Sequence, residues 1–168
     1  MEVRVARPEE YEEAGRVTAD AYREFVRPED SGDWDRYLAR IADVRERAGR
    51  TTIVVAVEDG RVLGSGTLEL TGRTEADEDD PVPPDESHLR MLGVDPSARG
   101  RGIARAIMAE CVRLSLEAGK TLMTLNTTKR MTAAMRMYES LGFERGEDEV
   151  FPDGFVLLSY AKRLDRPA

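Results

Sequence analysis

The chain has 168 residues, of which 40% are hydrophobic and 35% are charged, and its formal net charge at pH 7 is −8. This composition is typical of a globular domain with a hydrophobic core and excludes a disordered chain. The acidic balance argues against nucleic acid as a partner, because phosphates are repelled by a negative surface. No apolar run approaches the length that crosses a bilayer, so no membrane partner is expected.

The chain contains one cysteine, Cys111, and one histidine, His88. A single cysteine cannot form a disulfide within the chain, which suits a reducing compartment, and two soft ligands are too few for a zinc site. The N-terminus shows no signal-peptide pattern. We therefore expect a cytoplasmic protein without a metal ion. Because no repeat or linker divides the sequence, we expect a single domain over residues 1–168.

A short strand and two helices are predicted at the start of the chain. The strand covers residues 3–6, and the helix after it begins at Pro8, followed by two glutamates that suit its first turn. A break at residues 28–33 is rich in turn formers. The next helix carries apolar side chains at helical spacing, at Trp34, Leu38, Ile41 and Val44.

An antiparallel strand pair and an acidic loop come next. Strands at residues 52–57 and 62–70 flank Asp59-Gly60, a pair typical of hairpin turns. The loop at residues 71–85 is long for a compact domain, and such loops are often functional. Its acids lie next to a basic segment, as a site that handles one cation and one anion requires. A solvated acidic loop would give the same pattern, so both interpretations stay open.

The second half alternates strands and helices. Strands are predicted at residues 88–94 and 121–125, with a helix from about residue 102 to residue 118 between them. A helix at residues 131–141 follows, and then a final strand pair at residues 143–150 and 155–161. This order predicts a mixed α/β (α+β) fold with parallel pairing across the helical crossover.

The sharpest local feature is the segment Val94-Asp-Pro-Ser-Ala-Arg-Gly-Arg-Gly-Ile-Ala104. A strand ends there, and two glycines open a helix, whose unpaired N–H groups and dipole form an anion site. A nucleoside-triphosphate loop would end in Gly-Lys-Ser or Gly-Lys-Thr, which is absent. A dinucleotide loop would need a third glycine where the chain has Arg105.

Three pieces in register resemble the GNAT acetyltransferase superfamily. Arg99, Gly102 and Ala104 fit its pyrophosphate motif, Arg-x-x-Gly-x-Ala. The segment 89–96 is similar to the strand that precedes this motif, and Met135-Arg-Met-Tyr-Glu-Ser-Leu-Gly-Phe143 is similar to the later Leu-Tyr-x-x-x-Gly-Phe signature. The resemblance implies a mixed central sheet of about six or seven strands, splayed at the cofactor site and flanked by about four helices.

The resemblance also implies acetyl-CoA as the cofactor. Its pantetheine arm would lie between the strand that ends at Val94 and the strand at residues 122–125. The amides of residues 100–105 would hold the pyrophosphate. The implied cofactor-binding residues are Leu92, Gly93, Val94, Arg99, Gly100, Arg101, Gly102, Ile103, Ala104, Arg105, Asn126, Ala134 and Tyr138. Met131 departs from the family, which often has asparagine there.

Tyr138 is the candidate general acid. It matches the family tyrosine near the cofactor sulfur, and a phenol can protonate a departing thiolate. The alternative is a core tyrosine, because apolar residues share its helix face. The backbone N–H of Leu92 would serve as the oxyanion donor, as the resemblance implies.

His88 is the candidate general base, because Asn126 stands where some family members carry a glutamate. Strand alternation is expected to place His88, Arg90 and Leu92 on one face, with Glu86 one step further out as a second candidate. A histidine base predicts a rate that rises with pH near 6 to 7, the order of its ordinary pKa. The alternative is a structural histidine.

The predicted function is transfer of an acetyl group from acetyl-CoA to a primary amine of a small molecule or protein, by direct attack in a ternary complex. A cationic acceptor is expected to approach by the acidic loop. A non-catalytic acyl-CoA-binding sensor or interaction module is the alternative, since it too would bind the cofactor. Similar proteins are often dimers, and the sequence leaves a homodimer open.

Overall fold

One mixed sheet organises the residues that the computed structural model describes, 1–27 and 32–165. Its eight strands follow the order β1-β2-β3-β4-β5-β8-β6, and β7 pairs with β8. The strands are β1 (Glu2–Val5), β2 (Thr52–Glu58), β3 (Arg61–Glu69), β4 (Glu86–Val94), β5 (Leu122–Thr127), β6 (Glu144–Arg145), β7 (Glu149–Val150) and β8 (Val156–Arg163). The helices are α1 (Tyr11–Arg23), α2 (Asp33–Ala42), α3 (Val44–Ala48), α4 (Ile103–Glu117) and α5 (Thr132–Ser140). Most of the break predicted at residues 28–33 lies outside the described residues.

The pairing pattern confirms the predicted mixed α/β class. Strands β1 to β4 are antiparallel neighbours, whereas β4 and β5 run parallel because α4 crosses between them. The β2–β3 hairpin turns at Asp59 and Gly60, whose φ angles of 50° and 75° lie in the left-handed region that such a turn requires. Strand β8 then returns antiparallel to β5.

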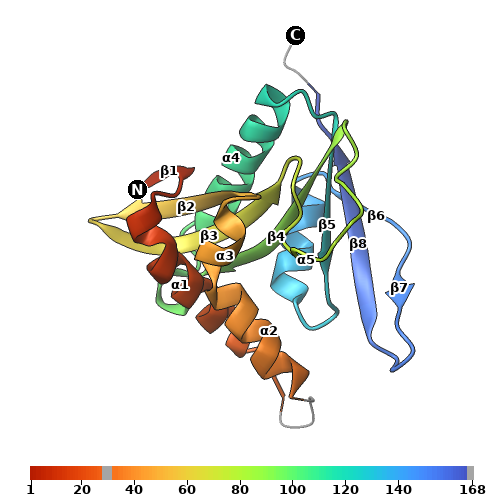
Figure 1. Ribbon diagram of the computed structural model, residues 1–168, viewed down its shortest axis with the longest axis horizontal. Helices are drawn as coiled ribbons and strands as arrows, with labels where there is room; N and C mark the ends of the chain where they lie inside the picture. Colours follow the sequence, from red (N-terminus) through yellow and green to blue (C-terminus); the bar gives the residue numbers. More distant parts are fainter. Residues whose placement is uncertain (28–31, 166–168) are drawn as a thin grey trace.

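Helices cover both faces of the sheet (Figure 1). A Cβ atom added at Gly64 would touch Ile103 and Ile107 of α4, whereas one added at Gly93 would touch α1. The main core therefore lies between the sheet and α4, and α5 joins it through Tyr138. None of the helices within the described residues is long and apolar enough to cross a membrane.

Strand β4 contains a β-bulge. Ser65 of β3 lies opposite Gly93, and Thr67 lies opposite Arg90, so β4 advances three residues where β3 advances two. Met91 lies within this stretch, and its φ of 52° places it in the left-handed region, uncommon for a residue with a side chain. The bulge reverses the alternation of side chains along the second half of the strand.

The expectation that His88, Arg90 and Leu92 share one face is therefore wrong for Leu92. Its side chain packs with the main core, where it would contact a Cβ atom placed at Gly66 on the α4 side. His88 and Arg90 keep the opposite face, and Met91 joins them there by packing on α1 and α2. The bulge thus places two consecutive side chains, 90 and 91, on the side away from α4.

Two predicted elements are each divided in two. The helix expected through Val44 stops at Ala42, because Asp43 leaves the helical region with a ψ of 69° and caps α3 by accepting from the Glu46 N–H. The strand expected at residues 143–150 pairs with β8 only at its two ends, as β6 and β7. The described residues therefore form eight strands and five α-helices, more than the sequence predicted.

A buried arginine ties α2 and α3 to the sheet. Arg47 is 2% exposed, and its Nε donates to Thr67 Oγ1 at 3.1 Å. Its terminal nitrogens donate to the carbonyl groups of Arg40, Ile41 and Asp43 at 2.9 to 3.1 Å. Burial lowers its pKa to about 10, so the guanidinium stays charged at pH 7. This contact fixes the end of α2, and the start of α2 forms one wall of the cavity described below.

Candidate active site

Strands β4 and β5 part halfway along their length. Their parallel pairing runs from Glu86 and Leu122 to Leu89 and Leu125 and stops there. Strand β4 continues to Val94 and β5 to residue 127, and Figure 1 shows the two diverging. The predicted splay is confirmed. Within the described residues, the edge of β4 that faces β5 beyond Leu89 has no strand partner, which leaves room for an extended ligand.

The glycine loop at the start of α4 has the geometry of an anion site. Gly100 and Gly102 have φ angles of 78° and 77°, and no atom lies within 4 Å of a Cβ placed on either. None of the backbone N–H groups of residues 100–105 donates a hydrogen bond to another described residue. These donors and the positive end of the helix dipole therefore remain available to a phosphate.

The arginines of this loop already have acidic or polar partners. Arg99 pairs with Glu24 at 2.6 Å, and Arg101 pairs with Glu58 at 2.8 Å. Arg105 donates to the Ser140 hydroxyl at 2.7 Å, which links α4 to α5. The resemblance implied that these arginines bind the cofactor and that the loop amides hold its pyrophosphate. In the structure the arginine side chains pair with these acidic or hydroxyl groups, whereas the backbone donors of the loop are free.

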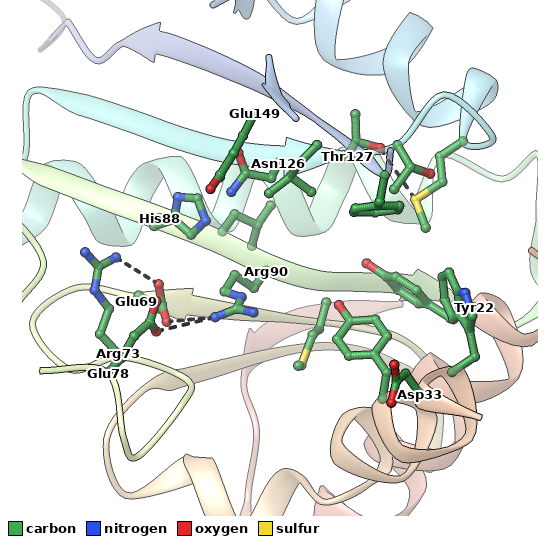
Figure 2. A pocket seen from close by; sticks show the side chains of 18 of the residues that line it. Tyr22, Asp33, Glu69, Arg73, Glu78, His88, Arg90, Asn126, Thr127 and Glu149 are labelled. Carbon is green, nitrogen blue, oxygen red and sulfur yellow. Dashed lines mark hydrogen bonds and ion pairs between the residues drawn. The ribbon is translucent and has the colours of Figure 1, made fainter. Parts of the chain in front are cut away.

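A cavity of about 840 Å³ opens where β4 and β5 part (Figure 2). Its floor comes from β3, β4 and β5, and its walls come from α1, α2, the loop after β3 and the β7–β8 hairpin. Its aromatic, charged and other polar lining side chains include Tyr22, Asp33, Trp34, Tyr37, Glu69, Arg73, Glu78, His88, Arg90, Asn126, Glu149 and Asp153. The cavity thus joins aromatic side chains with many titratable ones.

His88 occupies this floor between the neighbouring strands β3 and β5. Its Nδ1 lies 2.7 Å from the hydroxyl oxygen of Thr124 on β5, and its cross-strand neighbour on β3 is Glu69. Burial lowers the pKa of His88 to about 4, a shift that the nearby Glu69 carboxylate opposes and Arg90 reinforces. The imidazole is therefore neutral at pH 7. The predicted candidate base does reach the cavity.

Glu69, which the sequence analysis did not single out, is the central carboxylate of the cavity floor. It is fully buried, accepts a short hydrogen bond from the Thr74 N–H, and pairs with Arg73 at 3.4 Å and with Arg90 at 4.0 Å. Two guanidinium groups stabilise its charge. A glutamate that ends an apolar strand resembles an ordinary exposed strand end. Its position opposite His88 depends on the register of β3 and β4, which a long loop separates, so no local pattern indicates it.

Tyr138 lies on α5 at the edge of the main core and is 6% exposed. Its ring packs against Phe143 and Tyr160, with centroid distances of 5.9 and 6.1 Å. Burial, with a smaller contribution from Cys111, raises its pKa, so the phenol stays protonated. Burial raises the pKa of Tyr22, a cavity-lining residue, well above its ordinary value, and Tyr37 and Tyr138 add to that shift. Tyr138 itself does not line the cavity.

The other predicted site residues are divided between the cavity and its surroundings. Asn126 lines the cavity and accepts from the Ser159 hydroxyl at 3.2 Å, and Met131 lines it as well. Ala134 packs at the edge of the main core on α5. Glu86 lies at the start of β4, and the structure does not bring it to the cavity. His88 is therefore the better placed of the two candidate bases.

The chain belongs to the acetyltransferase (GNAT) family, whose family model matches residues 16–143. That span contains the parted strands, the glycine loop and α5. The chain is 31% identical over 120 residues to the glucosamine 6-phosphate N-acetyltransferase of Trypanosoma brucei brucei, an alignment that covers 67% of this chain and 72% of that protein. It is 34% identical over 111 residues to the N-acetylaspartate synthetase of Danio rerio but spans only 36% of that protein.

Solved structures share the fold at low sequence identity. An aminoglycoside 6′-N-acetyltransferase complexed with coenzyme A superposes with a TM-score of 0.72 at 14% identity, and the full length of both chains is covered. The yncA protein of Salmonella typhimurium, solved with acetyl-CoA, superposes with a TM-score of 0.69 at 19% identity over 100% of this chain and 96% of that one. Together with the family match, these likenesses confirm the predicted superfamily.

Proposed function

We propose that the chain is an acetyl-CoA-dependent N-acetyltransferase that acts on a primary amine by direct attack, with both substrates bound together. One observation carries this proposal: the gap between β4 and β5 opens onto the cavity that contains His88, on the same sheet that leads into the glycine loop. The relatives support it, since the two sequence relatives and the protein solved with coenzyme A are named as N-acetyltransferases or as an N-acetyl compound's synthetase.

The residues at the gap fit acetyl-CoA, which when bound supplies an activated acetyl thioester. The free N–H groups of residues 100–105 would hold its pyrophosphate. The unpaired edge of β4 from Leu92 to Val94 would hydrogen-bond its extended arm. Asn126, Ala134 and Tyr138 would border the end of that arm. In this arrangement Arg99 and Arg101 position the loop through their acidic partners.

The charges of the cavity favour a cationic acceptor. Its lining carries more carboxylates than guanidinium groups, namely Asp33, Glu69, Glu78, Glu149 and Asp153 against Arg73 and Arg90. Tyr22, Tyr37 and Trp34 form an aromatic wall with edge-to-face contacts at 6.3 and 5.8 Å. Aromatic faces and carboxylates both attract ammonium groups. The acceptor is therefore a primary amine that enters in its protonated form.

His88 and Tyr138 would carry the protons. His88, neutral at pH 7, takes a proton from the acceptor ammonium, and the Glu69 carboxylate stabilises the imidazolium that forms. The neutral nitrogen then forms a bond to the acetyl carbon while the carbon–sulfur bond breaks. Tyr138, kept protonated by burial, would donate its proton to the departing sulfur. The new amide nitrogen would then give up its remaining extra proton, which restores the Tyr138 phenol directly or through water, and His88 would release its own proton to solvent.

The direct test follows thiol release from acetyl-CoA in the presence of a panel of primary amines. We expect release with at least one amine, and His88→Gln to lower kcat about 10²- to 10⁴-fold, the usual contribution of a positioned base. The acidic limb of kcat/KM should lie near the His88 pKa of about 4 and not near 6 to 7. If the protein binds coenzyme A but no amine causes release of thiol from acetyl-CoA, the proposed activity is contradicted and the chain is a binding module instead.

A further inference from the structure

We propose that Thr124 is a positioning residue that holds His88 in the tautomer with its proton on Nδ1, leaving the Nε2 lone pair free. This inference rests on the proposed role of His88 as the base. It concerns which ring nitrogen of His88 carries the proton before the reaction, and the family match does not give Thr124 this role. Thr124 lies on β5 directly opposite His88 in the parallel pair, so the backbone register itself sets their contact.

Counting protons gives the direction of the hydrogen bond. The Thr124 hydroxyl has one proton and lies within reach of two acceptors, the Nδ1 atom of His88 at 2.7 Å and the carbonyl oxygen of Ser87 at 3.4 Å. Both contacts become hydrogen bonds only if the hydroxyl donates to Ser87 and accepts from a protonated Nδ1. A buried site favours the arrangement that satisfies every group.

The consequence falls on the other ring nitrogen. A neutral imidazole carries one proton, so a protonated Nδ1 leaves Nε2 as an acceptor that can take a proton from an ammonium group. The opposite tautomer would offer an N–H to the substrate and would repel its ammonium. Thr124 would thus act as the orienting partner of a base, a part played elsewhere by a carboxylate or carbonyl group.

The charged groups around His88 affect its pKa, but they do not determine which ring nitrogen is protonated. Glu69 lies beside it on β3, Arg90 lies two residues further along β4, and Arg73 comes from the loop after β3. Figure 2 shows Glu149 on the other side of the ring from Glu69. Of these groups, Arg73 and Arg90 lower the pKa of His88, and Glu69 raises it. None of them makes a hydrogen bond to the ring, so the tautomer depends on Thr124.

The chain offers an unusually clean test, because His88 is its only histidine. A two-bond proton–nitrogen NMR spectrum of the ¹⁵N-labelled protein near pH 7 reports one imidazole and identifies its protonated nitrogen. We expect a protonated Nδ1 and an unprotonated Nε2 in the free protein. A protonated Nε2 would overturn the proposal, whatever the activity of the enzyme.

Variants then connect the tautomer to the reaction. Thr124→Val keeps the shape and removes the hydroxyl; we expect protonated Nε2 to become the main form and kcat to fall about tenfold or more, within the range of general-base effects. The KM for acetyl-CoA should not change. Thr124→Ser should restore the tautomer and kcat. Thr121→Val is the matched control, since that hydroxyl donates only to the Asp85 carbonyl, outside the cavity.

The outcomes separate this proposal from the proposed function. An unchanged NMR spectrum and pH profile in Thr124→Val would overturn the role of Thr124. If His88→Gln is fully active while the wild-type spectrum shows a protonated Nδ1, His88 is not the base, but the assignment of its tautomer stands. If Thr124→Val does not fold, the wild-type spectrum and Thr124→Ser still decide, because Thr124→Ser must retain the wild-type tautomer.

Discussion

A histidine with a lowered pKa carries a free energy cost whenever it is charged in the folded protein. The pKa of His88 is about 4 in the fold, against about 6.5 for an unperturbed histidine. Below pH 6.5 His88 therefore binds a proton in the unfolded chain, whereas in the folded chain it stays neutral until the pH reaches about 4. The stability that depends on neutral His88 is complete above pH 6.5 and is lost as the pH falls through 4.

This predicts a pH-dependent difference between the wild type and His88→Gln. In urea unfolding between pH 7 and pH 4, the free energy of unfolding of the wild type should fall relative to the variant, by at most about 1.4 kcal/mol for each pH unit. The carboxylates titrate in both proteins, so their contribution cancels in the difference. If the difference in unfolding free energy between the two proteins stays constant over this pH range, the pKa of His88 is not lowered in the folded protein.

The hydroxyl of Tyr138 can be tested apart from its ring. Tyr138→Phe keeps the contacts with Phe143 and Tyr160, and we expect kcat to fall about ten- to a thousand-fold while coenzyme A affinity changes little. Tyr160→Phe is the control, because it removes a hydroxyl that donates to Glu139 at 2.9 Å in the same aromatic cluster. If Tyr138→Phe and Tyr160→Phe both lose turnover, or if both keep it, the Tyr138 hydroxyl has no specific role in the reaction and Tyr138 is a core residue.

At the residue scale, the sequence predicted side chains that have a distinctive chemistry and a strand position. His88 was expected as the base and Asn126 as a cofactor-binding residue, and both line the cavity. Glu69 and Arg73 were missed, because their burial depends on contacts with each other and with Arg90 across three segments. Glu86 was expected beside His88, but the cavity ends before the start of β4.

Helix α4 offers a matched pair of glycines at the element scale. Gly102 precedes its first residue and Gly119 follows its end, with φ angles of 77° and 79° and no atom within 4 Å of either added Cβ. Replacing either with glutamate strains the backbone by a similar amount, on the order of 1 kcal/mol or more. Only Gly102→Glu should abolish the rise in melting temperature that coenzyme A produces, because its carboxylate would meet the pyrophosphate.

The Gly119→Glu protein controls for folding in this experiment. It should melt lower than the wild type and still gain stability from coenzyme A. An equal gain in a folded Gly102→Glu protein would mean that the phosphates bind somewhere other than this helix start.

Elements were predicted well wherever local patterns determine them. The β2–β3 hairpin, α4 and the parting of β4 from β5 follow from a turn signal, a helical stripe and a family motif. The bulge in β4 could not be predicted, because its left-handed residue is Met91 and not a glycine. Nor could the division of the second helix at Asp43, where the buried Arg47 binds the nearby carbonyl groups.

For the whole molecule, we propose that residues 1–168 fold as one domain. The main core joins residues from β2 through to the end of β8, so neither half of the chain completes it alone. Urea unfolding followed by tryptophan fluorescence, which reports Trp34, and by far-ultraviolet circular dichroism should give one coincident transition. Two separated transitions would show that the α1–α2 region unfolds independently of the sheet.

The bulge at Met91 adds one side chain to the α1 and α2 side of the sheet without changing the register of the rest of β4. Removing Met91 would leave Arg90 opposite Thr67 and Gly93 opposite Ser65, so β4 would become regular and residues 92–94 would keep their faces. Gly93 would still lie against α1, where a Cβ atom would meet Thr18 at 3.1 Å. The deletion would instead take away the buried Met91 side chain, which packs with Ala19 of α1 and with Leu38 and Ile41 of α2, so the two helices would lose a shared contact with the sheet while the strand beside the cofactor gap stays in place.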